Sequence, residues 1–191
     1  MNNLIAVTIG DIEGIGIEIL IKLWKNKKIK NFVLITNIEI FKKYLIKKKI
    51  KIKYKKTENI EELKNYNKNL FLIFNIDAKN KDENTYKSLK ISYHLNKINI
   101  CNAIITLPLN KYKISKYLNK KFIGQTEFFQ NIDKKNYSSM IFYSKKIIIS
   151  PLTTHIPISE VHKFYKNRNF IYNKIKTINE ALISDFNIKN P

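Results

Sequence analysis

The stretch LIAVTIGDIEGIGIEILIKLWKN, residues 4–26, decides the fold class of this chain. Its first part, LIAVTI (4–9), is short, apolar and rich in β-branched side chains, which is typical of a buried strand. Gly10 ends this run, and a helical pattern extends from Gly16 to Asn26. A buried strand followed by a tight turn and a helix is the repeating unit of α/β proteins. The stretch therefore predicts a parallel sheet.

The same alternation of apolar runs and helical patterns continues along the chain. A buried strand is predicted at LFLIFN (70–75), and further strands at FVLIT (32–36) and NAIITLP (102–108). An edge strand is predicted at IKIKYK (50–55), and two later strands at SSMIFYS (138–144) and KIIIS (146–150). Helices are predicted over Ile38–Lys48, Glu83–Asn96 and Phe170–Phe186, with short helices after Pro108 and in TEFFQNI (126–132). We expect a three-layer α/β/α fold with a largely parallel sheet, and ligands beyond the carboxyl ends of its strands. No second domain is separated within residues 1–191, and the final DFNIKNP stops where a strand is due, so we expect a C-terminal truncation.

The composition limits the classes of function. The net charge is +21, but Arg168 is the only arginine among the 36 basic residues, and arginine is the side chain that binds phosphates and bases with a rigid fork. Abundant lysine and asparagine with scarce glycine and alanine indicate a gene rich in A and T, so we expect no specific nucleic-acid partner. The only cysteine, Cys101, lies beside an apolar strand and predicts a buried thiol. The N-terminus lacks a signal-peptide pattern and no apolar run is long enough to span a membrane, so we expect a cytoplasmic protein without a membrane partner.

Glycines and prolines are rare and concentrate at strand ends. Three of the four glycines lie in GDIEGIG (10–16), the fourth is Gly124, and Pro108, Pro151 and Pro157 follow apolar runs. The spacing is not G-x-G-x-x-G, so the dinucleotide-binding fingerprint is absent. Two interpretations of the glycine turn stay open. It is a tight structural turn in which Asp11 binds free backbone amides, or it contacts a ligand directly.

Four polar side chains at these strand ends are candidate site residues. Lys111 follows TLPLN and offers a positive charge to a phosphate, although a solvated lysine gives the same pattern. Gln125 and Thr126, in GQTEFF, suit a phosphate or carboxylate at a helix start, or Thr126 only caps that helix. His155, in SPLTTHIP, is a metal ligand, a proton carrier or a structural histidine. The two other histidines form no recognisable ligand spacing with it.

Together the four segments resemble one family, 4-hydroxythreonine-4-phosphate dehydrogenase, an enzyme of pyridoxal phosphate synthesis. GDIEGIGIE, AIITLPLNK, GQTEFF and TTHIPISEV follow the family patterns G-D-P-x-G-I-G-P-E, A-x-x-T-x-P-x-x-K, G-H-T-E-F and T-T-H-x-P-L-x-x-V in order and spacing. The resemblance covers essentially the whole chain, which corresponds to roughly the first three-fifths of a family member. Any one motif is weak, but four in sequence are specific.

The resemblance implies a fold like that of isocitrate and isopropylmalate dehydrogenases, and a homodimer with its active site at the subunit interface. It implies NAD or NADP, a divalent cation (zinc, magnesium or cobalt) and a small phosphorylated amino acid as substrate. The substrate's secondary hydroxyl is oxidised to a ketone, and the β-keto acid then loses carbon dioxide. By position, His155 matches the first of three metal-binding histidines. Gln125 and Thr126 match a substrate-binding His-Thr pair, and Lys111 matches the lysine of the proline–lysine motif.

The chain also departs from the family pattern. Gln125 replaces a histidine and cannot carry a proton, and Ile12 and Ile17 replace two prolines. The other two metal-binding histidines belong to family segments beyond position 191, so a complementing C-terminal chain is an expected partner. We expect a fragment, a split protein or a decayed gene product that is inactive alone. The alternatives from other classes are a non-catalytic dimerising remnant and a basic polyanion-binding protein.

Overall fold

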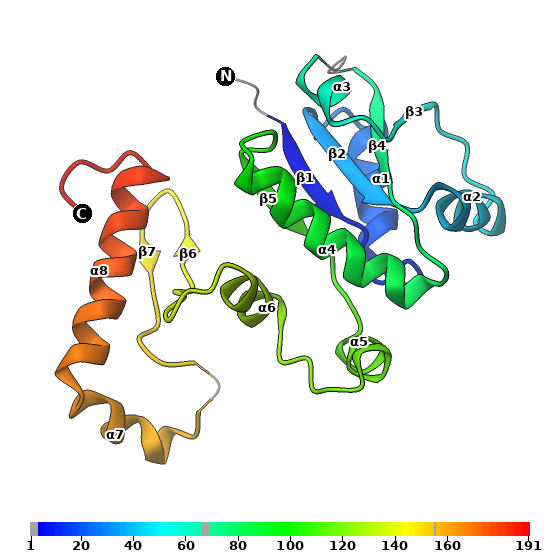
Figure 1. Cartoon of the computed structure of the whole chain (residues 1–191). Coiled ribbons are helices and arrows are strands. Elements are labelled where there is room, and N and C mark those ends of the chain that lie inside the picture. The colour runs from blue at the N-terminus through cyan, green and yellow to red at the C-terminus, as the bar shows by residue number, and fades with distance from the viewer. Residues whose placement is uncertain (1–3, 66–68, 155) are drawn as a thin grey trace. The chain divides into compact units, whose positions relative to one another are not determined.

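The computed structural model describes residues 4–65, 69–154 and 156–191 (Figure 1). The chain forms two compact units, Met1–Ile123 and Gly124–Pro191. Compactness of a segment does not show that it folds alone. The expectation that residues 1–191 hold no separate second domain therefore stays a prediction.

Five parallel strands form the sheet of the first unit. They are β1 (Ile5–Thr8), β2 (Phe32–Thr36), β3 (Tyr54–Thr57), β4 (Phe71–Asn75) and β5 (Ala103–Thr106), in the order β3-β4-β2-β1-β5. Ile5 of β1 pairs with Phe32 of β2 on one side and with Ala103 of β5 on the other. After β1 the chain forms β2, β3 and β4 on one side of β1, and β5 then pairs with β1 on its other side. The gap beyond the carboxyl ends of β1 and β5 is therefore the topological switch point, where open α/β sheets bind ligands.

Helices connect the parallel strands, because such strands cannot be joined by a hairpin. They are α1 (Gly16–Lys25), α2 (Ile38–Lys47), α3 (Ile60–Lys64) and α4 (Lys81–Lys97), and α5 (Lys111–Leu118) follows the last strand. Asparagine side chains accept hydrogen bonds from free amides at the starts of α2, α3, α4 and α5, through Asn37, Asn59, Asn80 and Asn110. Asparagine is among the best N-cap residues, so its abundance in this chain is put to structural use.

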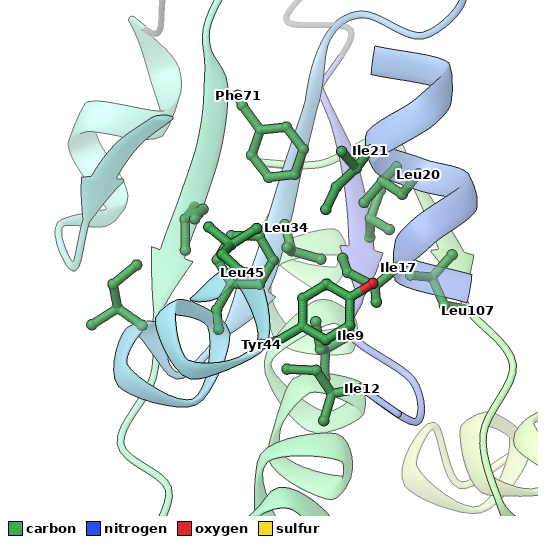
Figure 2. Packing of buried hydrophobic residues seen from close by; sticks show 14 of the residues in the cluster. Ile9, Ile12, Ile17, Leu20, Ile21, Leu34, Tyr44, Leu45, Phe71 and Leu107 are labelled. Atoms are coloured by element: carbon green, nitrogen blue, oxygen red, sulfur yellow. The ribbon is translucent and has the colours of Figure 1, made fainter. Parts of the chain in front are cut away.

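Each face of the sheet buries a hydrophobic cluster. On one face, α1 and α2 pack over side chains such as Leu34 and Phe71 (Figure 2). On the other face, α3 and α4 cover alternate strand residues such as Val33 and Leu72. The central strands β1, β2 and β4 are buried from both sides, which explains why they appear in the sequence as continuous apolar runs, whereas β3 and β5 at the ends of the strand order are partly exposed. The three-layer α/β/α prediction is confirmed.

The second unit is built from shorter elements. It contains α6 (Gln125–Ile132), an antiparallel pair of β6 (Phe142–Tyr143) and β7 (Ile148–Ile149), a 3-10 turn η1 (Ile158–Glu160), α7 (Val161–Tyr165) and α8 (Arg168–Ser184). Aromatic contacts link its parts, including Tyr137 with Phe170 and Tyr143 with Phe186. Within residues 124–154 and 156–191, no hydrophobic side chain is fully buried. This unit therefore lacks the dense core of the sheet unit.

The sequence predictions hold best in the first unit. Four predicted strands and the helices that begin near Gly16, Ile38 and Glu83 are present with small shifts in their ends. The edge strand predicted at 50–55 lies instead at Tyr54–Thr57, and the strands predicted at 138–144 and 146–150 shrink to a two-residue pair. Cys101 is buried as predicted. No helix within the described ranges is long and apolar enough to cross a membrane.

Candidate functional site

The glycine turn after β1 packs directly against the segment after β5, at the switch point of the sheet. The amide of Asp11 donates to the Pro108 carbonyl at 2.8 Å. Gly10 has a φ of +62°, and a Cβ built on it would lie 2.5 Å from the Pro108 oxygen. A Cβ on Gly16 would lie 2.9 Å from Pro108 Cδ. These glycines are required by close packing of two protein segments, so the structural interpretation accounts for them without a ligand.

Asp11 organises this turn through its carboxylate. Its Oδ1 accepts from the Glu13 amide at 3.0 Å, and its Oδ2 lies 3.0 Å from Lys113 Nζ. The hydrogen bond to Asp11 raises the pKa of Lys113, with Glu13 adding to the effect. The predicted role of Asp11 in binding a free amide of the turn is confirmed, and α5 supplies its cationic partner.

Three ammonium groups surround the Glu13 carboxylate. Lys81 Nζ lies 2.7 Å from Glu13 Oε1, Lys113 Nζ lies 3.4 Å from Oε2, and Lys47 Nζ lies 3.9 Å from Oε1. The hydrogen bond from Lys81 is the main cause of a lowered pKa of Glu13, followed by the hydrogen bond from Lys113. The three lysines belong to α2, α4 and α5, so a single carboxylate ties three helices to the glycine turn.

Side chains near the start of α4 form hydrogen bonds with the segments at the carboxyl ends of β1 and β2. Thr85 Oγ1 donates to the Gly10 carbonyl at 2.6 Å. Asn84 is fully buried; its Oδ1 accepts from the Asn37 amide at 2.7 Å, and its Nδ2 donates to Thr36 Oγ1 at 3.0 Å. Buried polar groups are stabilising only when they are hydrogen-bonded, and here the bonds hold the carboxyl ends of β1 and β2 in place.

The predicted site residues fall in different parts of the chain. Lys111 is exposed at the first position of α5, in the first unit. Gln125 and Thr126 begin α6 in the second unit. The N-cap of α6 is Gly124, without a side-chain cap, so the prediction that Thr126 caps this helix is wrong. His155 lies outside the described residues. The binding roles of all four residues stay predictions.

Sequence analysis missed the side chains that build the switch-point site. Lys81 and Lys113 are hidden among many lysines, and nothing in the sequence distinguishes them. Thr85, Ser88 and Ser92 did leave a signal, because they are small polar residues at helical spacing and all are buried on α4. Of these three, Thr85 reaches the segment after β1, whereas the hydroxyls of Ser88 and Ser92 donate to carbonyls of α4 itself. Small polar residues at helical spacing could have been recognised as a buried helix face.

The residues present do not complete a metal site. In residues 4–65, 69–154 and 156–191, no three His, Cys, Asp or Glu side chains are grouped closely enough to hold an ion. A protein site for a catalytic divalent metal uses about three such ligands. Any metal chemistry would therefore need ligands beyond those that the described part of this chain provides.

Comparison with known proteins gives a consistent result. The family model for pyridoxal phosphate biosynthetic protein PdxA matches residues 27–191. A 4-hydroxythreonine-4-phosphate dehydrogenase of Aquifex aeolicus is 32% identical over 97% of this chain and 60% of its own length. One from Hydrogenobaculum is 29% identical over 93% of this chain and 58% of its own length. The chain thus spans about three-fifths of the length of these relatives.

A solved structure supports the fold. The crystal structure of 4-hydroxythreonine-4-phosphate dehydrogenase from Klebsiella pneumoniae superposes with a TM-score of 0.80 at 20% identity, over 95% of this chain and 59% of that one. Because the match includes nearly all of this chain, the similarity extends over both units.

Proposed function

Because this chain belongs to the pyridoxal phosphate biosynthetic protein PdxA family, we propose that it forms the N-terminal part of a metal-dependent and NAD- or NADP-dependent dehydrogenase. The proposed reaction oxidises the secondary hydroxyl of 4-phosphohydroxy-threonine to a ketone, after which the β-keto acid decarboxylates. The observation that carries this proposal is the match of 97% of the chain to a relative named for that activity.

The proposal assigns roles to the four predicted residues. His155 is a metal ligand, Gln125 and Thr126 bind substrate, and Lys111 binds its phosphate. The other metal ligands come from a complementing chain that corresponds to the remaining two-fifths of the relatives. When bound, the metal polarises the substrate hydroxyl and the nicotinamide accepts the hydride.

The proposal also includes a homodimer, and the second unit supports it. Phe142, Tyr143 and Ile149 of the β6–β7 pair are each more than half exposed. Clustered exposed apolar side chains are typical of protein interfaces. A second copy of the chain would bury them, as it would in a dimer whose active site lies between subunits.

Complementation tests the proposal. The purified chain is supplied with Mg²⁺ or Zn²⁺, NAD and 4-phosphohydroxy-threonine, and NADH is followed by absorbance. We expect no NADH from the chain alone and restored activity after addition of the C-terminal segment of the Aquifex relative. His155→Asn should abolish the restored activity, whereas His162→Asn, which changes an exposed histidine on α7, should not.

Sedimentation of the same samples measures the dimer. We expect the chain to sediment as a dimer, with or without the added segment. Rapid turnover by the isolated chain would show that it needs no further metal ligands. Restored activity that is unaffected by His155→Asn would contradict the metal role of this residue.

A further inference from the structure

A cavity of about 820 Å³ opens at the carboxyl edge of the sheet, entirely within the first unit. Small-molecule sites typically enclose about 300–1,000 Å³, so its size suits a ligand. Its walls come from the glycine turn, α2, the segment that leads into α4, and α5. The cavity is therefore bounded by the same elements that meet around Glu13.

Lysines dominate the lining of this cavity. They are Lys43, Lys47, Lys48, Lys79, Lys81, Lys113 and Lys116, and the acidic lining residues are Glu13 and Asp82. Half of the lining residues are thus cationic, whereas basic residues make up 36 of 191 in the chain. This difference indicates a local concentration of positive charge, which draws an anion toward the cavity.

Glu13 serves as an internal counter-ion for part of this charge. Three ammonium groups approach its carboxylate within 3.9 Å, an arrangement that also suits a phosphate oxygen. Among the described residues, no carboxylate lies within ion-pair distance of Lys43, Lys79 or Lys116. Glu13, with Asp11 beside Lys113 and Glu18 beside Lys48, therefore neutralises only part of the charge. A ligand with several negative charges would neutralise more of it.

Two tyrosines give the cavity an aromatic component. Tyr112 is 75% exposed at the start of α5, so its ring is available for stacking. Tyr44 lies against the buried cluster between α1 and α2 (Figure 2), and its hydroxyl is buried with no hydrogen-bond partner among the described residues. In Figure 2 this hydroxyl points toward Ile17 of α1, within the buried cluster, so we assign it no contact with a ligand.

We propose that this cavity binds an oligophosphate group, a chain of three linked phosphates, and that the ligand displaces Glu13 from its lysines. The phosphate chain contacts Lys47, Lys81 and Lys113, and a ring attached to it stacks on Tyr112. The source is a free oligophosphate or a nucleoside triphosphate, which share this chemistry. The proposal does not depend on dehydrogenase activity.

Calorimetric titration of the full chain with inorganic triphosphate tests the proposal, with ATP and NAD in parallel. At about 0.15 M salt the Debye length is about 8 Å, so attraction by distant surface lysines is mostly screened. We expect saturable binding of triphosphate. Lys81→Gln should weaken it about five-fold, the size of one partly exposed charge pair. Glu13→Gln should tighten it by about the same factor, because Lys47 and Lys81 then lose their internal counter-ion, whereas Lys113 keeps Asp11.

Matched controls come from a surface pair outside the cavity. Glu61 and Lys64 form an exposed ion pair at 2.7 Å on α3, so Glu61→Gln and Lys64→Gln change the net charge equally without touching the cavity. We expect both to leave affinity within about two-fold.

ATP that binds more tightly than triphosphate identifies a nucleotide as the source, and equal affinity identifies the phosphate chain alone. If the cavity variants and the control variants changed the affinity for triphosphate equally, the net charge of the chain would explain the effect, and the proposal would be overturned. Absence of triphosphate binding, or binding of NAD alone, would overturn it as well.

Discussion

Replacing Gly10 by alanine tests whether the glycine turn is docked on Pro108. An L-residue in the left-handed region costs about 1–2 kcal/mol. The new Cβ would also lie 2.5 Å from the Pro108 oxygen and 2.9 Å from Leu107 Cβ. Overpacking of this kind costs about 1–3 kcal/mol. The lower conformational entropy of the unfolded chain with alanine offsets about 0.4–1 kcal/mol of this loss. We expect Gly10→Ala to lower the free energy of unfolding of the first unit by about 2–4 kcal/mol.

Trp24 is the only tryptophan and gives a suitable probe. Its partly buried ring packs edge-on against the core of the first unit, with ring centroids 5.7 Å from that of Phe32 and 5.9 Å from that of Phe71. Its fluorescence during urea unfolding therefore reports on this unit. With a slope of about 1–3 kcal/mol per M, the midpoint should fall by roughly 1–2 M.

Gly14→Ala is the matched control for this substitution. Its Cβ would meet only the Asp11 oxygen at 3.2 Å and Asp11 Cβ at 3.6 Å, and φ at Gly14 is not positive. We expect a loss below about 1 kcal/mol. Equal effects of the two substitutions would refute the argument that contact with Pro108, rather than general turn flexibility, requires Gly10.

Two further predictions concern buried polar groups. Asn84→Ala removes the acceptor of the Asn37 amide and the donor to Thr36 Oγ1. We expect the free energy of unfolding, measured by Trp24 fluorescence, to fall by about 2–3 kcal/mol. The control Asn102→Ala, at an exposed position, should have little effect. Burial raises the pKa of the Cys101 thiol from 9.0 to about 12. The buried neutral thiol therefore contributes its full stabilisation below about pH 9. This contribution is lost as the pH rises toward 12. The stability difference between the natural chain and Cys101→Ala should therefore shrink between about pH 8 and about pH 10.5, and a constant difference would contradict the burial effect.

The sheet was predictable because its central strands are buried on both faces. Such strands leave continuous apolar runs, of which the first ends at Gly10, and this signal does not depend on distant contacts. Strand β5 is partly exposed, but Pro108 marks its end in the sequence. The position of β3 does depend on them, because Tyr54 pairs with Phe71 and this register sets where the edge strand begins. Helix α3, with five residues, is too short to show a helical period.

The second unit shows where apolar composition misleads. The runs at 138–144 and 146–150 predict two full strands, but only Phe142–Tyr143 and Ile148–Ile149 pair. Phe142 is 58% exposed and Ile149 is 53% exposed. Strand length depends on neighbouring strands and on burial, and the described residues of this unit provide little of either. The homodimer proposed above would cover these apolar side chains.

Two of the three lysines of α5, Lys111 and Lys113, separate the proposed functions in space. Consecutive helical residues turn by about 100°, so side chains two positions apart point about 200° apart. Lys113 is directed toward Asp11 and Glu13 at the glycine turn. Lys111, the residue that the family pattern marks for substrate, is therefore directed away from the lysine-lined cavity, and it is absent from the lining of that cavity. Under the two proposals the same helix start would serve two surfaces, so loss of phosphate binding at one should leave the other intact.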